Sequence, residues 1–219
     1  MIIDHHPSDE LLLDYSSGAM LEGWSLAVST HLALCPDCRQ SVRDMEAIGG
    51  ALMESLSPVP LAEKSSQAVF AELSAAIVPS NDLSLPQSGK SFSVLPEPLR
   101  QYAGGDLSDV PWQRLGLGAY QYLIPTGDDE TIVRLLRIPA GKPVPAHSHG
   151  GLELTLVLSG AFSDETGFYR RGDIQEVDET LEHQPHAAGG EDCICLAVTD
   201  SPLRLRSLAA RLVQPFIGI

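Results

Sequence analysis

Residues 31–38, HLALCPDC, bring three metal-binding side chains close together in the sequence. His31 and Cys35 are four positions apart, so on a helix they project from the same face. Pro36 suits the first turn of a following helix, which returns Cys38 to the same corner. Zinc takes four nitrogen and sulfur ligands in a tetrahedron, and either histidine of the upstream pair His5-His6 can supply the fourth. The spacing therefore predicts a zinc site.

Two other interpretations of Cys35 and Cys38 stay open from the residues alone. The pair has the C-x-x-C spacing of a redox dithiol, but such dithiols normally follow a strand in a βαβ unit, and the surrounding pattern is helical. Alternatively, both thiols pack in a helical core and His31 caps a helix. Zinc is the favoured interpretation.

A second cluster of histidines with an acid lies in GKPVPAHSHGGLELTLVLSG, which ends at Gly160. His147 and His149 alternate on an extended segment and face the same way, and Glu153 follows on the next strand. A glycine stands at a turn position on each side of the three residues. The spacing G-x5-H-x-H-x3-E-x6-G resembles the first cupin motif, and this resemblance implies a small β-barrel whose lumen holds a metal on three histidines and one carboxylate.

The third histidine of the cupin resemblance falls in YRRGDIQEVDETLEHQP. Gly172 and Asp173 stand at a turn, and His183 occupies the position of the expected ligand. The segment lacks the usual Pro-x-Gly before this histidine and the Asn after it. His186 therefore competes with His183 for the same role.

The identity of the second metal decides what that site can do. Zinc with four protein ligands in a tetrahedron leaves no position for a substrate, whereas octahedral iron or manganese keeps two positions open. A metal enzyme and a metal-bound sensor both fit these ligands. Cys193 and Cys195 alternate on a predicted strand and face the same side, where burial as small apolar residues is the commoner role and redox chemistry the second.

Helical periodicity fills the first third of the chain and predicts four helices. The first is opened by Ser8 and closed near Gly18, and the others cover residues 24–34, 36–56 and 61–77. Beyond them, VPSNDLSLPQSGKSFSVLP is rich in Ser and Pro and has no period, as expected of a linker.

After the linker, short β-rich runs alternate with turn residues, a pattern typical of an all-β sandwich or barrel. The sequence thus predicts an α+β protein of two domains. The helical zinc-binding domain covers residues 1–78, the linker residues 79–96, and the all-β cupin barrel residues 97–219.

The charge of the chain excludes one class of partner. Its 219 residues include 29 acids and 14 bases, giving a formal net charge of −15. Affinity for nucleic acid comes mostly from Lys and Arg on phosphates, so a basic protein partner is expected instead. No apolar run reaches the roughly 18 residues of a membrane-spanning helix. The start MIIDHHPSDE is too polar for a signal peptide, so we expect a cytoplasmic protein whose cysteines are thiols or metal ligands.

The whole arrangement resembles the ChrR family of anti-sigma factors, in which a zinc-binding anti-sigma domain is fused to a cupin domain. The resemblance runs from HHPSDELLLDY through HLALCPDC and GLELTLVLSGAFSDE to DCICLAVTD and the terminal QPF. It implies that the helical domain wraps an extracytoplasmic-function sigma factor and blocks its contact with core RNA polymerase. It also implies that the cupin is needed for the response to oxidative stress such as singlet oxygen.

The family resemblance also implies which residues bind metal. The first zinc is held by His6, His31, Cys35 and Cys38. The second metal is zinc, or alternatively iron, manganese or nickel, and it is held by His147, His149, Glu153 and His183.

Three classes of function follow from these residues. The favoured one is an anti-sigma factor, a regulator of transcription that performs no catalysis. The second is a metal-dependent cupin enzyme, such as a dioxygenase or isomerase, with a helical accessory domain. The third is a zinc-stapled scaffold that binds some other protein.

Overall fold

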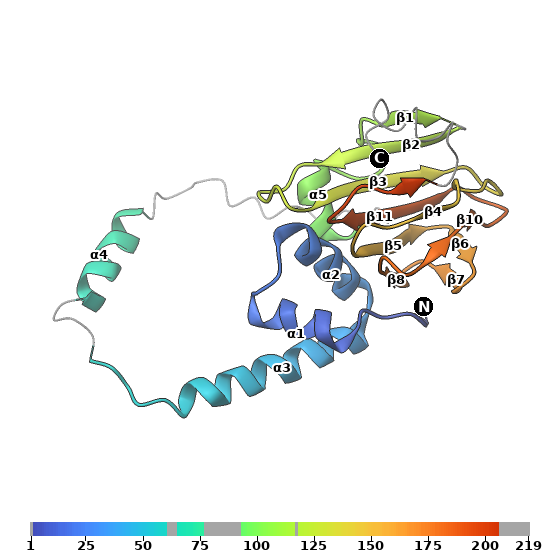
Figure 1. The fold of residues 1–219 in the computed structure, drawn as a ribbon. Helices are drawn as coiled ribbons and strands as arrows, with labels where there is room; N and C mark the ends of the chain where they lie inside the picture. Colours follow the sequence, from blue (N-terminus) through green and yellow to red (C-terminus); the bar gives the residue numbers. More distant parts are fainter. Residues whose placement is uncertain (1, 61–64, 77–92, 117, 206–219) are drawn as a thin grey trace. The chain divides into compact units, whose positions relative to one another are not determined.

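The computed structural model describes residues 2–60, 65–76, 93–116 and 118–205 (Figure 1). Within these ranges the helices are α1 (Asp9–Ser17), α2 (Glu22–Leu34), α3 (Pro36–Glu54), α4 (Ser65–Ala76) and α5 (Glu97–Ala103). The strands are β1 (Gln113–Gly116), β2 (Ala119–Ile124), β3 (Ile132–Ile138), β4 (His147–Ser148), β5 (Glu153–Ser159), β6 (Ala161–Asp164), β7 (Gly167–Arg170), β8 (Ile174–Val177), β9 (Glu182–His183), β10 (His186–Ala187), β11 (Cys193–Thr199) and β12 (Arg204–Leu205).

The helices begin and end where local chemistry favours it. The Ser8 hydroxyl accepts a hydrogen bond from the Leu11 N–H at 3.4 Å and caps α1, which ends at Gly18 with a φ of 72°. Pro36 is the first residue of α3, as predicted. The predicted fourth helix corresponds to α4, although its expected ends at residues 61–64 and 77 lie outside the described ranges. The short helix α5 was not predicted.

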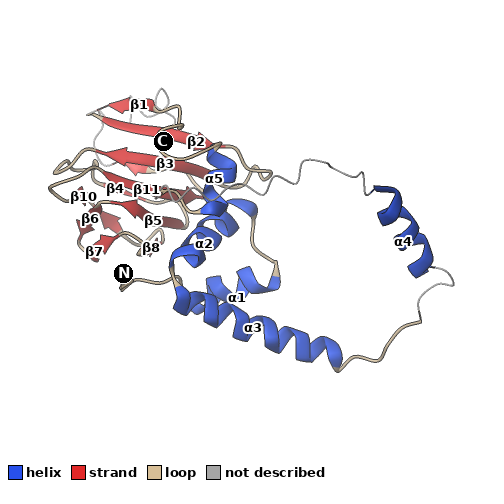
Figure 2. Cartoon of the chain, turned by 180° about the vertical axis from the view of Figure 1, so that it is seen from behind, coloured by secondary structure: helices blue, strands red, loops and turns tan. Residues whose placement is uncertain are grey.

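Within the described residues, all paired strands are antiparallel and form three sheets. The predicted combination of N-terminal helices and a C-terminal β domain is therefore confirmed (Figure 2). The large sheet has the order β1-β2-β3-β11-β5-β8, and the small ones β10-β6-β7 and β12-β4-β9. In the last of these, β4 pairs with β9 so that His147 lies opposite His183. This register places two predicted ligands side by side.

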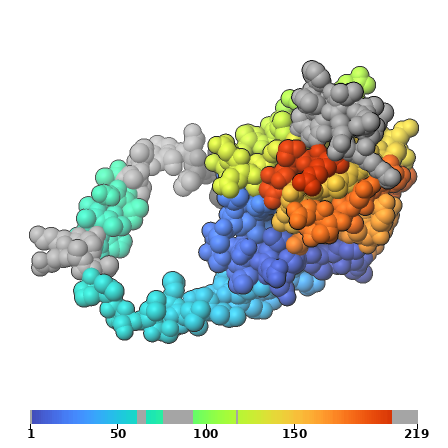
Figure 3. All heavy atoms as spheres, in the orientation of Figure 1, coloured from blue at the N-terminus to red at the C-terminus, as the bar shows by residue number. Residues whose placement is uncertain are grey.

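The neighbouring strands β11 and β5 of the large sheet are covered on both faces. Along β11, Cys193 and Cys195 line a cavity inside the β domain, while Leu196 and Val198 join the core that contains Trp24 and other residues of α2 and α5. The strand β5 alternates in the same way. The helices α2 and α5 therefore pack on the outer face of the sheet that forms the cavity wall. Figure 3 shows the blue N-terminal residues packed against the yellow and orange residues of the β domain.

The chain divides into two compact units: residues 1–47 with 93–219, and residues 48–92. The first unit thus joins α1, α2 and the start of α3 to the β domain. The expected boundaries at residues 78 and 97 stay a prediction, and residues 79–92 of the expected linker lie outside the described ranges. Among the described helices, none combines the length and apolarity needed to cross a membrane.

Candidate metal centres

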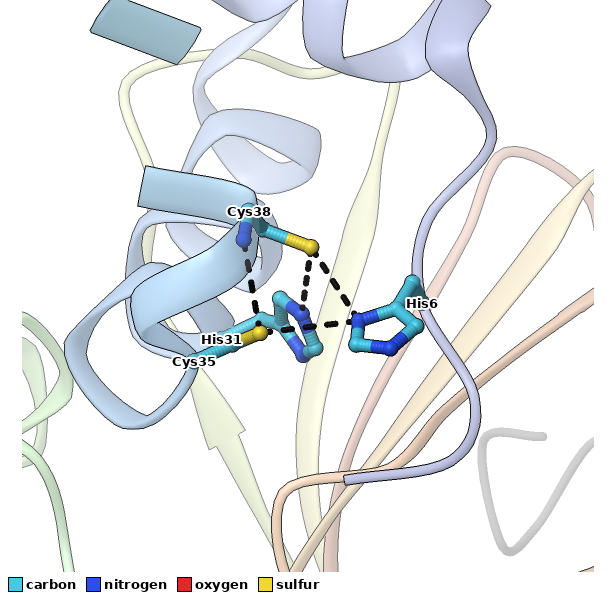
Figure 4. Close-up of side chains that lie close together, drawn as sticks. All are labelled: His6, His31, Cys35 and Cys38. Atoms are coloured by element: carbon cyan, nitrogen blue, oxygen red, sulfur yellow. Dashed lines mark hydrogen bonds between the residues drawn. The ribbon is translucent and has the colours of Figure 1, made fainter. Parts of the chain in front are cut away.

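The first centre is a cluster of two histidines and two cysteines where α2 ends and α3 begins (Figure 4). His6 comes from the segment before α1, His31 from the last turn of α2, and Cys35 and Cys38 from the α2–α3 corner. One ligand atom from each residue lies within 4.8 Å of all the others. The structure thus brings together four side chains that the sequence singled out, and of the two adjacent histidines it is His6 that lies in the cluster.

The distances inside this cluster suit a tetrahedral metal ion. The Cys38 Sγ lies 3.2 Å from His6 Nδ1 and 3.3 Å from His31 Nε2, and Cys35 Sγ lies 3.5 Å from His6 Nδ1. A nitrogen and a sulfur bound tetrahedrally to one zinc ion are about 3.6 Å apart, given Zn–N and Zn–S bonds of about 2.1 and 2.3 Å. The Cys38 N–H also points at Cys35 Sγ from 3.4 Å, an arrangement that stabilises a thiolate. The donor set and its spacing fit a bound metal.

His31 is held in the protonation state that a metal ligand needs. Its Nδ1–H donates to the carbonyl oxygen of Gly172 at 2.9 Å, so Nε2 carries the free lone pair that faces Cys38. The ring is fully buried, and burial lowers the pKa of His31 to about 4. Burial, followed by the hydrogen bond with Cys35, raises the pKa of Cys38 to about 12. A metal ion must therefore displace a thiol proton here, whereas the imidazole is already neutral at pH 7.

The β domain supplies part of this centre, which the sequence did not indicate. The Asp173 carboxylate is fully buried, and its Oδ1 accepts the N–H groups of Asp4 and His5 at 2.8 and 3.1 Å. The Ile174 N–H donates to the His5 carbonyl at 3.2 Å. These bonds fix the backbone directly before His6. The only signal in the sequence was the turn at Gly172 and Asp173, which says nothing about what the turn contacts.

The second centre lies inside the β domain and consists of His147, His149, Glu153 and His183. All four are buried, and one ligand atom from each lies within 4.8 Å of the others. His147 comes from β4, Glu153 from the start of β5 and His183 from β9. The structure brings this predicted set together as well.

Three ring nitrogen atoms of the second centre converge at separations that fit a bound cation. His183 Nε2 lies 3.0 Å from His149 Nε2 and 3.1 Å from His147 Nε2. The Nδ1–H of His147 donates to the Pro145 carbonyl at 2.8 Å, so its Nε2 is a lone-pair donor. Two nitrogens that bind one ion at about 2.1 Å are about 3.0 to 3.4 Å apart. The observed separations fit a metal.

Asp164 orients His183 for this role. Its Oδ2 accepts the His183 Nδ1–H at 2.7 Å, which leaves Nε2 free, and it also accepts a hydrogen bond from the Gln175 amide at 2.7 Å. Burial raises the pKa of Asp164, but hydrogen bonds from Gln175, Thr166 and His183 outweigh it and lower the pKa below its usual value. Nothing in the sequence motif pointed to Asp164 or Gln175.

Burial disfavours the charged forms of three of these ligands: His147, His149 and Glu153. Burial lowers the pKa of His147 to about 4, and burial together with the neighbouring histidines lowers that of His149 to about 3. Burial raises the pKa of Glu153, whose Oε2 lies 3.4 Å from His149 Nδ1. A divalent ion would reverse this preference of Glu153 by stabilising the carboxylate.

A cavity of about 80 Å³ opens beside the second centre. Its wall includes His147, Glu153, Cys193 and Cys195, and most of the remaining lining is apolar. Both cysteines are free thiols and are buried. The hydrogen bond with Cys193, followed by burial, raises the pKa of Cys195, so this thiol is protonated at neutral pH. The two cysteines face the same side of β11, as the alternation predicted.

His5 and His186, the alternatives to His6 and His183, lie outside both clusters. The ring of His5 packs against Tyr169, with 4.3 Å between ring centroids. His186 is exposed on β10, and its Nδ1–H donates to the carbonyl of Gln184 at 2.7 Å. The geometry thus places His6 and His183, and neither competitor, among the potential ligands.

Comparisons with known proteins agree with this architecture. The family model of the ChrR cupin-like domain matches residues 100–202. The anti-sigma-E factor ChrR of Cereibacter sphaeroides (strain ATCC 17023) is 48% identical over 220 residues, which span 100% of both chains. The crystal structure of Rhodobacter sphaeroides SigE in complex with the anti-sigma ChrR matches with a TM-score of 0.78 and 48% identity, covering 91% of this chain and 100% of that one. The chain belongs to the ChrR family of anti-sigma factors.

Proposed function

We propose that this protein binds an extracytoplasmic-function sigma factor and inhibits it by occupying the surface that core RNA polymerase needs. The observation that carries this proposal is the 48% identity over the full length to an anti-sigma factor, together with the match to a ChrR chain in complex with SigE. Inhibition of this kind is competition for a surface, so it requires no catalysis. The acidic chain, with a net charge of −15, suits a basic partner.

An exposed apolar surface supports a protein partner. Twelve large apolar side chains are exposed in the described part of the chain, and eight of them lie between residues 48 and 73. They are Ile48, Leu52, Met53, Leu56, Val59, Val69, Phe70 and Leu73. Ile48, Leu52 and Leu56 are spaced four apart along and just beyond α3, and Val69 and Leu73 are spaced four apart on α4. Such a concentration marks a docking surface.

Binding to purified SigE of Rhodobacter sphaeroides tests this proposal. The double substitution Phe70→Asp with Leu73→Asp places two charges on the exposed face of α4, and we expect it to weaken SigE binding about tenfold or more. Phe168→Asp is the matched control, because Phe168 is 54% exposed and Phe70 69%, but Phe168 belongs to the β domain. Equal affinities for all three proteins, or no binding by the unsubstituted chain, would refute the docking surface.

We further propose that the first centre binds zinc through His6, His31, Cys35 and Cys38. Two thiolates and two imidazoles in a tetrahedron are a typical structural zinc site, and the distances above support it. The metal would join the segment before α1 to the α2–α3 corner and so stabilise a helical unit with a small core. Metal analysis of the purified protein tests this.

For the second centre we propose zinc on His147, His149, Glu153 and His183, with iron, manganese or nickel as the alternative occupants. Two zinc ions per chain support the proposal, whereas one zinc with one iron, manganese or nickel supports the alternative. The enzyme class has no specific observation in its favour, since the full-length relative is named as an anti-sigma factor.

We propose that the β domain triggers release of the sigma factor under oxidative stress such as singlet oxygen. The support is the cavity in which Cys193 and Cys195 lie beside His147 and Glu153, since thiols and imidazoles react with oxidants. Release of SigE from a preformed complex by singlet oxygen or peroxide tests this. If His147→Ala with Glu153→Ala leaves release unchanged, the second centre is not the sensor.

A further inference from the structure

Four consecutive residues, Gly172 to Gln175, connect the two candidate metal centres. We propose that this segment couples them, so that a metal in one centre raises the affinity of the other for its metal. Asp173 and Gln175 act as positioning residues at its two ends. This inference rests on the proposed function, because it describes how a change in the β domain reaches the helices that bind the sigma factor.

One end of the segment shapes the first centre. The Gly172 carbonyl accepts the His31 Nδ1–H at 2.9 Å, and the buried Asp173 carboxylate accepts the N–H groups of the two residues before His6. The same carboxylate is fixed in place by the Arg170 N–H, which donates to Oδ2 at 2.9 Å. Two of the four ligands of the first centre therefore depend on this turn for their position.

The other end of the segment shapes the second centre. The Gln175 amide donates to Asp164 Oδ2 at 2.7 Å, and the same oxygen accepts the His183 Nδ1–H at 2.7 Å. Gln175 also lines the cavity beside His147 and Glu153. A displacement of His183 when metal binds or leaves is thus transmitted to Gln175 through one shared carboxylate oxygen.

The start of β8, which joins the two ends of this segment, makes contacts on both of its faces. Ile174 is buried in the core that includes residues of α2, whereas Gln175 faces the cavity. The strand β8 also pairs with β5 in a register that sets Val177 opposite Glu153. Packed elements of this kind shift as units, so movement at one centre displaces the other. Coupling between two binding sites is necessarily reciprocal.

Cobalt(II) titration distinguishes the two centres in the intact chain. A cobalt ion bound by Cys35 and Cys38 gives a thiolate-to-metal charge-transfer absorption, and the second centre contains no thiolate in its proposed ligand set. We therefore propose to measure cobalt affinity at the first centre, under anaerobic conditions, in four proteins. These are the unsubstituted chain, His147→Ala, Gln175→Ala and the double variant.

The proposal predicts a specific pattern in this cycle. Disabling the second centre with His147→Ala lowers the cobalt affinity of the first about tenfold, within the usual range for coupled sites. In the Gln175→Ala background the same substitution has no further effect. If His147→Ala leaves the first centre unchanged, or if its effect persists in full without Gln175, the coupling through this segment is refuted.

The positioning role of Asp173 is tested by substitution, and Asp128, a carboxylate with a similar structural role, provides the control. Asp128 also joins the helices to the β domain, because its Oδ2 accepts the Gly23 N–H at 3.0 Å, but it contacts none of the potential ligands. Asp173→Ala should weaken cobalt binding at the first centre 10- to 100-fold, the usual effect of removing a group that orients a ligand. Asp128→Ala should leave that affinity unchanged.

Equal effects of the two substitutions would overturn the positioning role. If Asp173→Ala does not fold, Asp173→Asn, which keeps one acceptor oxygen, should show an intermediate loss. These titrations contain no sigma factor, so they test the coupling between the two centres independently of the proposed function. The proposed function is tested separately, by SigE binding.

Discussion

His31 at the end of α2 donates its Nδ1–H to the backbone carbonyl of Gly172, 141 positions later in the chain, at 2.9 Å. This bond joins a potential metal ligand of the helices directly to the β domain. At the other end of α2, the Gly23 N–H donates to Asp128 and the Tyr102 hydroxyl donates to Glu22 at 2.6 Å. The helix is therefore anchored to the β domain at both ends.

Substitution of first-centre ligands should remove one metal ion per chain. His31→Ala and Cys35→Ala each delete a donor from a four-residue set, and the remaining three hold zinc much more weakly. We expect SigE binding to be lost with the metal, because the helical unit has little core without it. Metal analysis and binding of the same samples check this.

His186→Ala is the control for those variants, since His186 is an exposed histidine outside both clusters. It should retain the full metal content and SigE affinity. Unaltered SigE affinity in a His31→Ala protein that has lost its metal would refute the structural role of the first centre.

Gly23→Ala should loosen the contact between α2 and the large sheet. A Cβ at this position would lie 2.8 Å from Val133 Cγ2 and 2.9 Å from Thr131 Cβ, and it would also meet the Thr131 hydroxyl. Because these atoms belong to a packed strand and its border, we expect the free energy of unfolding to fall by about 1–3 kcal/mol. Urea denaturation measures the change.

Gly49→Ala is the matched control in α3, where a Cβ meets nothing within 4 Å. Alanine favours the helix over glycine, so this variant should be unchanged or up to about 1 kcal/mol more stable. A Gly23→Ala protein as stable as Gly49→Ala would mean that α2 does not pack on the sheet as described.

The stability of the metal-free protein should depend on pH through three buried histidines. Burial lowers the pKa of His31 and His147 to about 4 and that of His149 to about 3. In the unfolded chain the pKa of each histidine is about 6.5. Below that pH the unfolded state therefore binds more protons than the folded state, and folding is disfavoured. The stabilising contribution is fully present above pH 6.5 and is lost as the pH falls toward the folded values.

Chelator-treated protein should therefore lose up to about 4 kcal/mol of unfolding free energy per pH unit below about pH 6.5. Urea midpoints between pH 7 and pH 5 measure this loss. His149→Gln removes one of the three histidines and should reduce the dependence of the unfolding free energy on pH by about a third. A flat midpoint across this window would contradict the burial of neutral histidines.

The sequence predicted most of the local structure because the signals were local. Ser8, Gly18 and Pro36 mark helix ends through their own conformational preferences. Alternation along an extended segment predicted that His147 and His149 face the same way, and the cupin-like spacing added Glu153 from the next strand. His183 came from the cupin resemblance, and the structure supplies its physical basis, the β4–β9 register that sets it opposite His147.

The contacts between distant segments were beyond local signals. Asp173 and Asp164 orient metal-binding histidines through hydrogen bonds to residues far away in the chain, and no spacing rule reports such contacts. The sequence does contain one signal for the packing of α2. Eight of its residues are buried, so its segment WSLAVSTHLAL is apolar on more than one face, as expected of a helix covered by both α1 and a sheet.

Competition with core RNA polymerase for a sigma factor tests the central claim most directly. Transcription from a SigE-dependent promoter is measured with SigE of Rhodobacter sphaeroides and core enzyme while the metal-loaded protein is added. We predict that transcription falls to background near one equivalent of protein per SigE, and that the Phe70→Asp with Leu73→Asp variant requires about tenfold more. Undiminished transcription at a large excess of the metal-loaded protein would contradict the account.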